Sequence, residues 1–137
     1  MNAERTVLEY YDALRAGESL HPYFAEEDGA VKFGISERLD GYEEIENGLR
    51  EQTETTTDWT VESHDLVVTE RERTAWFGDD VRMAWTALED EDEGVRHEFT
   101  TRWSGCLERH EHGSRAPSDG TGDWRFVSMH VSVARDL

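Results

Sequence analysis

The chain of 137 residues carries 14 Lys and Arg residues against 32 Asp and Glu residues, which gives a formal net charge of −18 at pH 7. Such an acidic surface repels nucleic acid and anionic membranes, so we predict neither as a partner. No apolar run could span a bilayer, the first residues lack the layout of a signal peptide, and Cys106 is the only cysteine. The sequence therefore predicts a cytoplasmic protein with one domain over residues 1–137 and no disulfide.

The amino-acid balance favours a folded protein from a salt-rich cytoplasm. Five Trp, four Tyr and five Phe residues argue against disorder, which high net charge alone would permit. Thirteen of the fourteen basic residues are Arg, and Lys32 is the only lysine. At molar salt, counter-ions screen the repulsion between carboxylates to within a few ångströms. We therefore predict a halophilic, haloarchaeal host.

The N-terminal third of the chain predicts two helices and a strand. An apolar stripe with helical spacing covers residues 3–16, and Gly17 supplies the stop. A short second helix is expected over residues 20–24, where Pro22 fits only within a first turn. Weak alternation over residues 30–35 is typical of a first strand.

A third helix is predicted to begin after Asp40. Asp40 and Glu43 have the spacing of a capping box, in which each side chain accepts from a backbone amide at the helix start. The apolar stripe of this helix consists of Tyr42, Ile45 and Leu49. The helix should end in the β-branched run of residues 55–57.

The chain after Asp58 is rich in Val, Thr, Trp and Phe and predicts antiparallel strands. Residues 79–80 and 89–94 are predicted hairpin turns, and a flexible loop is expected over about residues 110–122. Together the elements predict an α+β fold. We expect a cone in which three N-terminal helices pack on a curved, mainly antiparallel sheet.

Several local motifs add a family resemblance to this order of elements. They are YYDALRAGE (10–18), LDGYEEIENGLR (39–50), TAWFGDDVRMAW (74–85), TTRWSGCLER (100–109) and GDWRFVSMHVS (122–132). The chain thereby resembles the nuclear transport factor 2-like superfamily, and specifically its SnoaL-like branch. The resemblance implies a cone-shaped domain that encloses one pocket, and a homodimer formed through the outer face of the sheet. It implies no single reaction, because the superfamily includes both enzymes and non-enzymes.

Arg102 is the leading candidate for contact with a ligand. Alternation along its strand places Arg102 on one face with Thr100 and Ser104. The resemblance implies a pocket role, because a matching arginine of the kinase-association members lines the pocket and can bind acidic ligands. Here the guanidinium could orient a carboxylate or carbonyl group. The alternative is an ion pair with one of the many acidic residues. The two interpretations are equally supported by the sequence.

The resemblance also bears on proton-transfer chemistry. Tyr10 falls at the position of the tyrosine donor of the ketosteroid isomerases, but its place in the apolar stripe of the first helix favours a core aromatic residue. The position of their general-base aspartate falls at Lys32 or Phe33, so activity of that type is not expected. His130 is a possible acid or base if the strand register turns it inward, and otherwise a structural histidine.

The predicted pocket combines the polar candidates with aromatic and apolar side chains. Its members are Tyr10, Phe33, Trp76, Trp85, Arg102, Ser104, Met129 and Val131. His110 and His112 lack a third ligand at suitable spacing, so no metal site is predicted, and no motif calls for a cofactor. Cys106 is expected to be a small buried residue.

We predict a SnoaL-like pocket protein that binds a small, mostly apolar molecule with one polar end. One alternative is an isomerase, lyase or hydrolase that acts on a polyketide- or steroid-like substrate. The other is a dimeric structural or adaptor domain without a ligand. An interior cavity below roughly 100 Å³ would favour the adaptor, because ligand pockets measure about 300 Å³ or more.

Overall fold

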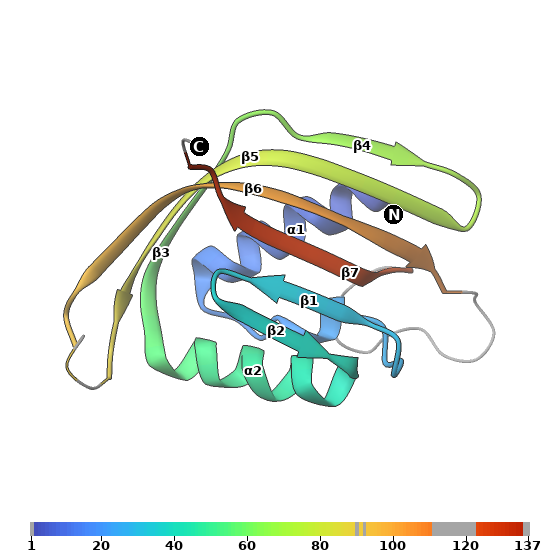
Figure 1. Cartoon of the computed structure of the whole chain (residues 1–137). Helices are drawn as coiled ribbons and strands as arrows, with labels where there is room; N and C mark the ends of the chain where they lie inside the picture. Colours follow the sequence, from blue (N-terminus) through green and yellow to red (C-terminus); the bar gives the residue numbers. More distant parts are fainter. Residues whose placement is uncertain (1, 90, 92, 111–122, 136–137) are drawn as a thin grey trace.

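A bent sheet of seven strands wraps around the N-terminal helix, and the second helix lies beneath one end of it (Figure 1). The computed structural model describes residues 2–89, 91, 93–110 and 123–135. The elements in chain order are α1 (Ala3–Ala16), a 3₁₀ turn (His21–Tyr23), β1 (Val31–Gly34), β2 (Glu37–Asp40), α2 (Gly41–Thr55), β3 (Thr56–Ser63), β4 (Val67–Glu70), β5 (Thr74–Ala87), β6 (Arg96–Arg109) and β7 (Trp124–Val133).

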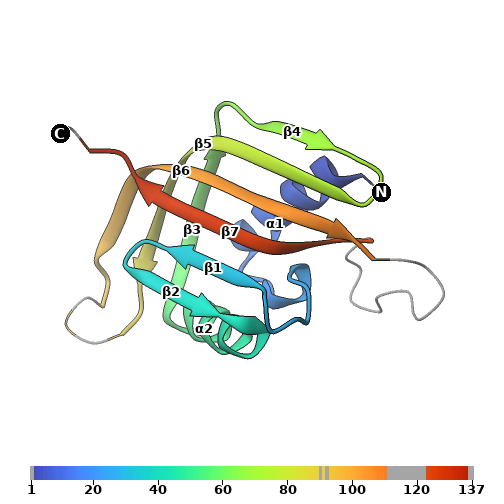
Figure 2. The ribbon, with the colours of Figure 1, turned by 45° about the vertical axis from the view of Figure 1, so that its right-hand side comes forward.

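The sheet is mixed but mostly antiparallel, which confirms the α+β class. Its strands follow the order β2-β1-β7-β6-β5-β3, and β4 pairs with the part of β5 that β3 does not cover. Among the described pairs, β1 and β7 run parallel and the others antiparallel. The long strands β5 and β6 curve along their length (Figures 1 and 2), so the sheet has a concave face that receives α1.

The prediction of three helices is wrong, since the described residues hold two α-helices. In place of the second predicted helix the chain makes one 3₁₀ turn, His21–Tyr23. The turn cannot extend because Phe24 is already in an extended conformation and bridges Phe126 of β7. The Ala25 N–H donates to the Phe126 carbonyl at 2.9 Å, so sheet pairing uses the backbone groups that a further helical turn would need.

Helix α1 covers the predicted range and stops at the predicted residue. Asn2 caps its start by accepting a hydrogen bond from the Arg5 N–H at 2.8 Å. Gly17, with φ of 72°, closes its end in the left-handed conformation that glycine adopts without strain. Its buried apolar face includes Val7, Tyr10, Tyr11 and Leu14.

Helix α2 begins where predicted, but the capping box does not form. Asp40 is the N-cap residue, yet its carboxylate makes no capping hydrogen bond. The first helical amides donate instead to backbone carbonyls of residues 27–30. Glu44, rather than Glu43, accepts from the Asp40 N–H at 3.0 Å. The preceding loop thus satisfies the amides of Gly41 and Tyr42, the first two of the helix.

The predicted turn at residues 79–80 is also wrong. Strand β5 runs through this point without interruption, and Asp79 is buried while Asp80 is exposed. The break falls in the neighbouring edge, where β3 ends at Ser63 and β4 starts at Val67. The Asp79 carboxylate accepts hydrogen bonds from the Ser63 hydroxyl and the Asp65 N–H at this break. Because Asp79 is bonded in this way, two consecutive acidic residues do not end strand β5 here.

The strand predicted over residues 30–35 is confirmed as β1, but the sequence did not predict β2, which pairs with it as a hairpin. Ser36, with φ of 63°, reverses the chain between β1 and β2, and Gly34 faces Glu37 in the register. The predicted flexible loop lies almost entirely outside the described residues, and the turn at 89–94 is described only in part. None of the described helices is long and apolar enough to cross a membrane.

Candidate functional site

A cavity of about 400 Å³ lies between α2 and the concave face of the sheet. Both helices and six of the strands contribute lining residues. The volume falls within the range of small-molecule sites, which begins at about 300 Å³. The interior of the fold is therefore hollow at this end and not filled by side chains.

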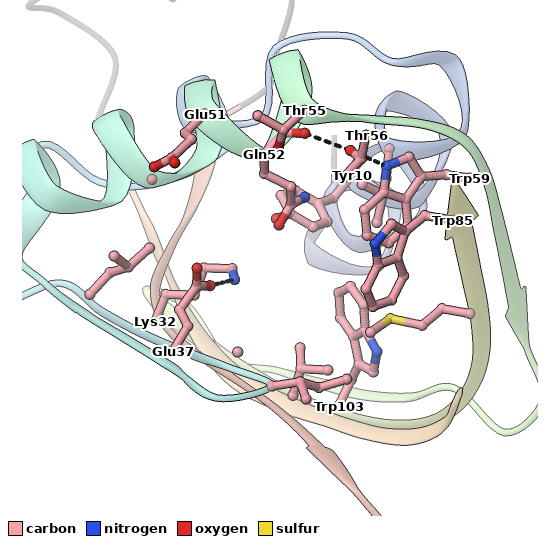
Figure 3. Close-up of a pocket in the computed structure, with 17 residues that line it drawn as sticks. Tyr10, Lys32, Glu37, Glu51, Gln52, Thr55, Thr56, Trp59, Trp85 and Trp103 are labelled. Carbon is pink, nitrogen blue, oxygen red and sulfur yellow. Dashed lines mark hydrogen bonds and ion pairs between the residues drawn. The ribbon is translucent and has the colours of Figure 1, made fainter. Parts of the chain in front are cut away.

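One side of the cavity is an aromatic wall. The rings of Trp59 and Trp85 stack with centroids 4.8 Å apart and planes inclined by 21°. Figure 3 shows this pair at one side of the cavity, with Trp103 next to it. The Trp59 indole N–H donates to the Thr56 hydroxyl at 2.8 Å, which fixes its ring. Stacked rings of this kind present a rigid, apolar surface to a flat ligand.

The opposite side carries an ion pair between the buried Lys32 and the partly exposed Glu37 (Figure 3). Lys32 Nζ lies 2.7 Å from Glu37 Oε1, and Lys32 is only 5% exposed. Gly34 leaves room for this pair, because a Cβ there would lie 2.5 Å from Glu37 Oε1 and 3.1 Å from Lys32 Nζ. Any larger residue at position 34 would therefore displace the Lys32 and Glu37 side chains.

The β1–β2 hairpin is what turns both charges inward. Lys32 lies beside Met129 of β7, which is buried, while its neighbour Phe33 lies beside the exposed His130. Side chains alternate along a strand, so Lys32 must share the inner face with Met129. The tight turn then brings Glu37 back within reach of Lys32.

Tyr10 lines the cavity between the aromatic wall and the ion pair. Its ring makes edge contacts with four aromatic rings, among them Trp103 and Phe126. Burial raises the pKa of the Tyr10 hydroxyl well above its ordinary value of 10.0, and the charge of Glu37 raises it further. Within the described residues no hydrogen bond uses this hydroxyl, so it can donate to a ligand.

Helix α2 supplies further polar groups from above the cavity (Figure 3). Glu51 and Gln52 both line it, and the Gln52 side-chain amide makes no hydrogen bond within the part of the chain that the structure describes. The Gln52 backbone carbonyl accepts from the Thr56 hydroxyl at the helix end. The cavity thus offers an ammonium group, two carboxylates, an amide and a phenol at its polar end.

Three of the eight predicted pocket residues line this cavity: Tyr10, Trp85 and Val131. Met129 is buried in the adjacent core. The remaining four, together with His130, belong to the opposite face of the sheet. They are Phe33, Trp76, Arg102 and Ser104.

The prediction that Arg102 projects into the interior is wrong. Trp103 is buried and Arg102 is exposed, so alternation turns Arg102 outward together with Ser104. Both side chains line a separate depression on the outer face, along with His130. The expected burial of Cys106 is wrong for the same reason, since it shares this exposed face.

The aromatic residues Phe33 and Trp76 also lie on the outer face. Phe33 packs against the ring of His130 with centroids 5.5 Å apart, and the Arg38 guanidinium lies over it. Trp76 is 46% exposed, with the guanidinium of Arg71 over its ring at 5.3 Å. Neither aromatic ring reaches the cavity.

The sequence analysis missed the polar half of the site, Lys32 with Glu37, and two of its aromatic residues, Trp59 and Trp103. One signal for Lys32 was present in the composition, because it is the only lysine of the chain. No pattern marked Glu37, because its place depends on a hairpin turn that the sequence does not predict. Among the described residues, no group of three His, Cys, Asp or Glu side chains could hold a metal ion.

The bent sheet, the helix within it and the hollow end define an NTF2-like fold. Residues 3–136 match the SnoaL-like domain, so the chain belongs to the SnoaL-like domain family. The resemblance read from the sequence motifs is thereby confirmed. A search of curated proteins finds no match.

Solved structures share the fold at low sequence identity. An NTF2-like superfamily protein from Salmonella enterica serovar Typhimurium LT2 is 15% identical, with a TM-score of 0.74 over 97% of this chain and 89% of its own. A ketosteroid isomerase-like protein from Erwinia carotovora atroseptica is 16% identical, with a TM-score of 0.69 over 97% and 94%. An NTF2-like protein of unknown function from Pseudomonas putida KT2440 is 14% identical, with a TM-score of 0.72 over 98% and 85%. These likenesses concern the fold and not the activity.

Proposed function

We propose that the protein binds a small, mostly apolar molecule with one polar group, and that Lys32 and Glu37 contact that group. The observation that carries the proposal is an ion pair between the buried Lys32 and the partly exposed Glu37, which lies opposite an aromatic wall in a cavity of about 400 Å³. Burying charge without partners is costly, so such a pair inside a hollow favours a ligand that completes its hydrogen bonds. Lys32, and not Arg102 as the sequence predicts, would thus be the cation that contacts the polar group of the ligand.

A second candidate is proton transfer at a carbon next to a carbonyl group. The observation in its favour is the unpartnered Tyr10 hydroxyl, whose pKa is raised by burial and by the nearby Glu37 carboxylate. Glu37 would act as the base and Tyr10 would donate a hydrogen bond to the developing enolate oxygen. The likeness to a ketosteroid isomerase-like protein accords with this candidate at the level of the fold.

Calorimetric titration with 2-naphthylmethanol tests the binding proposal, because this probe combines a flat apolar body with one hydroxyl group. We expect saturable binding, weakened about tenfold by Trp85→Ala, which removes half of the aromatic wall. Trp76→Ala is the matched control, since Trp76 lies on the outer face. Equal affinities of the two variants, or no binding to the wild type, would contradict the proposal. Isomerisation of a β,γ-unsaturated cyclic ketone by the wild type would favour the second candidate.

The volume of the cavity counts against the third alternative, an adaptor with a filled interior. The homodimer, the halophilic host and the cytoplasmic location stay predictions. A homodimer through the outer face of the sheet would cover exposed aromatic surface, because Trp76 lies there. The molar mass in solution, measured by light scattering, tests it.

A further inference from the structure

The only lysine of the chain lies in the cavity. The other thirteen basic residues are Arg, and Arg also occupies the other buried basic position among the described residues, Arg125. Burial therefore does not by itself select Lys over Arg in this protein. Lys32 is 5% exposed and its Nζ is 2.7 Å from Glu37 Oε1.

Ion pairing does not explain the choice either. A guanidinium group binds a carboxylate through two parallel hydrogen bonds and is always charged, so Arg serves at least as well in a buried pair. Lys differs in one chemical respect: its amine can give up a proton and then attack an electrophile. A lysine used once, in a hollow and next to a proton acceptor, points to that property.

We propose that Lys32 forms a reversible imine with the aldehyde or ketone group of an apolar molecule bound in the cavity. The proposal deepens the proposed function and rests on it, because the aromatic wall must first hold the apolar body of the ligand. Trp59 and Trp85 lie on the side of the cavity opposite Lys32 (Figure 3). A ligand whose flat apolar body packs on this aromatic wall would therefore point its polar end toward the Lys32 amine.

The groups around Lys32 can carry every proton of the reaction. Glu37 takes one proton from the ammonium group, and the Lys32 nitrogen forms a C–N bond while the π pair of the carbonyl moves to its oxygen. Glu37 returns this proton to the oxygen, takes a second proton from the nitrogen and gives it to the departing hydroxyl. The C–O bond breaks, water leaves, and the nitrogen lone pair completes the C=N bond. An ammonium and a carbonyl thus become an iminium and water, with no oxidation or reduction.

Tyr10 and Gly34 make this step possible in space. The Tyr10 hydroxyl lines the same cavity as Lys32 and Glu37, and the charge of Glu37 helps to raise the pKa of this hydroxyl. The hydroxyl can therefore donate a hydrogen bond to the carbonyl oxygen of the ligand as negative charge develops on that oxygen. The absent side chain at Gly34 lets the Glu37 carboxylate lie against β1, because a Cβ there would be 2.5 Å from Glu37 Oε1. The carboxylate is thereby held next to the Lys32 amine, where it can take and return protons.

The experiment uses 2-naphthaldehyde with sodium cyanoborohydride, which reduces an iminium to a stable secondary amine. Lys32 is the only lysine of this sequence, so peptide mapping by mass spectrometry distinguishes its adduct from that of an α-amine. We expect Lys32 to react at least about ten times faster in the folded protein than in protein unfolded by urea. Added 2-naphthylmethanol should slow this labelling, and Glu37→Gln should reduce it while the α-amine reacts as before.

Three results would overturn the imine. Labelling of the α-amine without Lys32, while 2-naphthylmethanol still binds, would overturn it and leave the proposed function in place. Equal labelling of Lys32 in folded and unfolded protein would show ordinary amine reactivity only. Failure of both naphthalene compounds to bind would overturn the proposed function and the imine together. The Lys32→Arg variant, checked for folding by circular dichroism, confirms the assignment by losing only the Lys32 adduct.

Discussion

At the scale of single residues, Asp79 joins three parts of the fold. Its carboxylate accepts hydrogen bonds from the Tyr11 hydroxyl at 2.8 Å, the Ser63 hydroxyl at 2.6 Å and the Asp65 N–H at 3.0 Å. These donors belong to α1, to the end of β3 and to the connection before β4. Burial and the adjacent Asp79 together raise the pKa of Tyr11 well above its ordinary value, so this phenol stays a donor.

We predict that Asp79→Asn lowers the free energy of unfolding by about 1–3 kcal/mol, because an amide offers one acceptor oxygen where the carboxylate offers two. Urea denaturation followed by tryptophan fluorescence measures the change. Asp80→Asn is the matched control, and its exposed side chain should change stability by less than about 0.5 kcal/mol. Equal effects at the two positions would show that the Asp79 hydrogen bonds do not stabilise the fold.

Residue identity alone does not show this role. Two consecutive Asp residues are typical of a turn, and the sequence offers no sign that Tyr11, 68 positions away, donates to one of them. The same limit applies to the site. Tyr10 and Trp85 follow from helical and strand spacing, but the meeting of Lys32 with Glu37 depends on a turn at Ser36, whose φ of 63° is uncommon for serine.

At the scale of secondary-structure elements, one glycine allows the close contact between β6 and β7. A Cβ at Gly105 would lie 2.3 Å from the Ser128 carbonyl oxygen and 3.2 Å from the Met129 Cα. The register between the strands shifts directly after this point, between Cys106 and Leu107. Backbone atoms cannot move aside as a flexible side chain can, so the position requires glycine.

We predict that Gly105→Ala destabilises the protein by about 1–3 kcal/mol or more, because the added methyl group forces the two strands apart. Thermal unfolding followed by circular dichroism measures the effect. Gly78→Ala is a matched control in the neighbouring strand, where the new Cβ would meet only the Trp103 carbonyl oxygen at 3.9 Å. This control should leave stability unchanged or raise it slightly, since alanine suits a strand better than glycine. A larger loss at Gly78 would contradict the argument.

Elements with a single apolar stripe are the ones that the sequence predicts best. Helix α1 has one such stripe, so both its range and its buried face were predictable. Strand β6 alternates as expected, but alternation divides its residues into two faces without saying which is inside. Trp103 and Leu107 mark the inner face by their apolarity, and the choice of Arg102 for the interior went against that signal.

At the scale of the whole molecule, the fold concentrates negative charge on its surface. Among the buried polar and charged residues that the structure describes, Asp79 is the only one with a carboxylate. The other described acidic side chains are exposed or partly exposed. The sequence has 14 Lys and Arg residues to balance its 32 Asp and Glu residues, so the surface carries an excess of negative charge. The composition predicted this excess correctly, but it gave no sign of the cavity, which only the family resemblance led us to expect. A hollow arises only from the relative placement of α2, the hairpin and the bent strands, and each of them is compatible with a filled core.

We predict that the free energy of unfolding rises as KCl increases from about 0.1 M to about 1 M. Mutual repulsion of surface carboxylates destabilises the compact state, and the screening length falls over this range from about 10 Å to about 3 Å. Urea denaturation at each salt concentration measures the change. The prediction follows from a net charge of −18 on a chain of 137 residues.

A charge-reduced variant separates this screening from a general effect of salt on apolar burial. Glu18→Gln, Glu26→Gln and Glu72→Gln together remove three exposed negative charges. If repulsion limits stability, the triple variant is more stable than the wild type at about 0.1 M KCl. Its free energy of unfolding then rises less as salt is added. If both proteins gain equally, the salt acts by strengthening apolar burial, because that effect does not depend on surface charge. A wild type that is equally stable at both salt concentrations would contradict the proposed adaptation to a salt-rich cytoplasm.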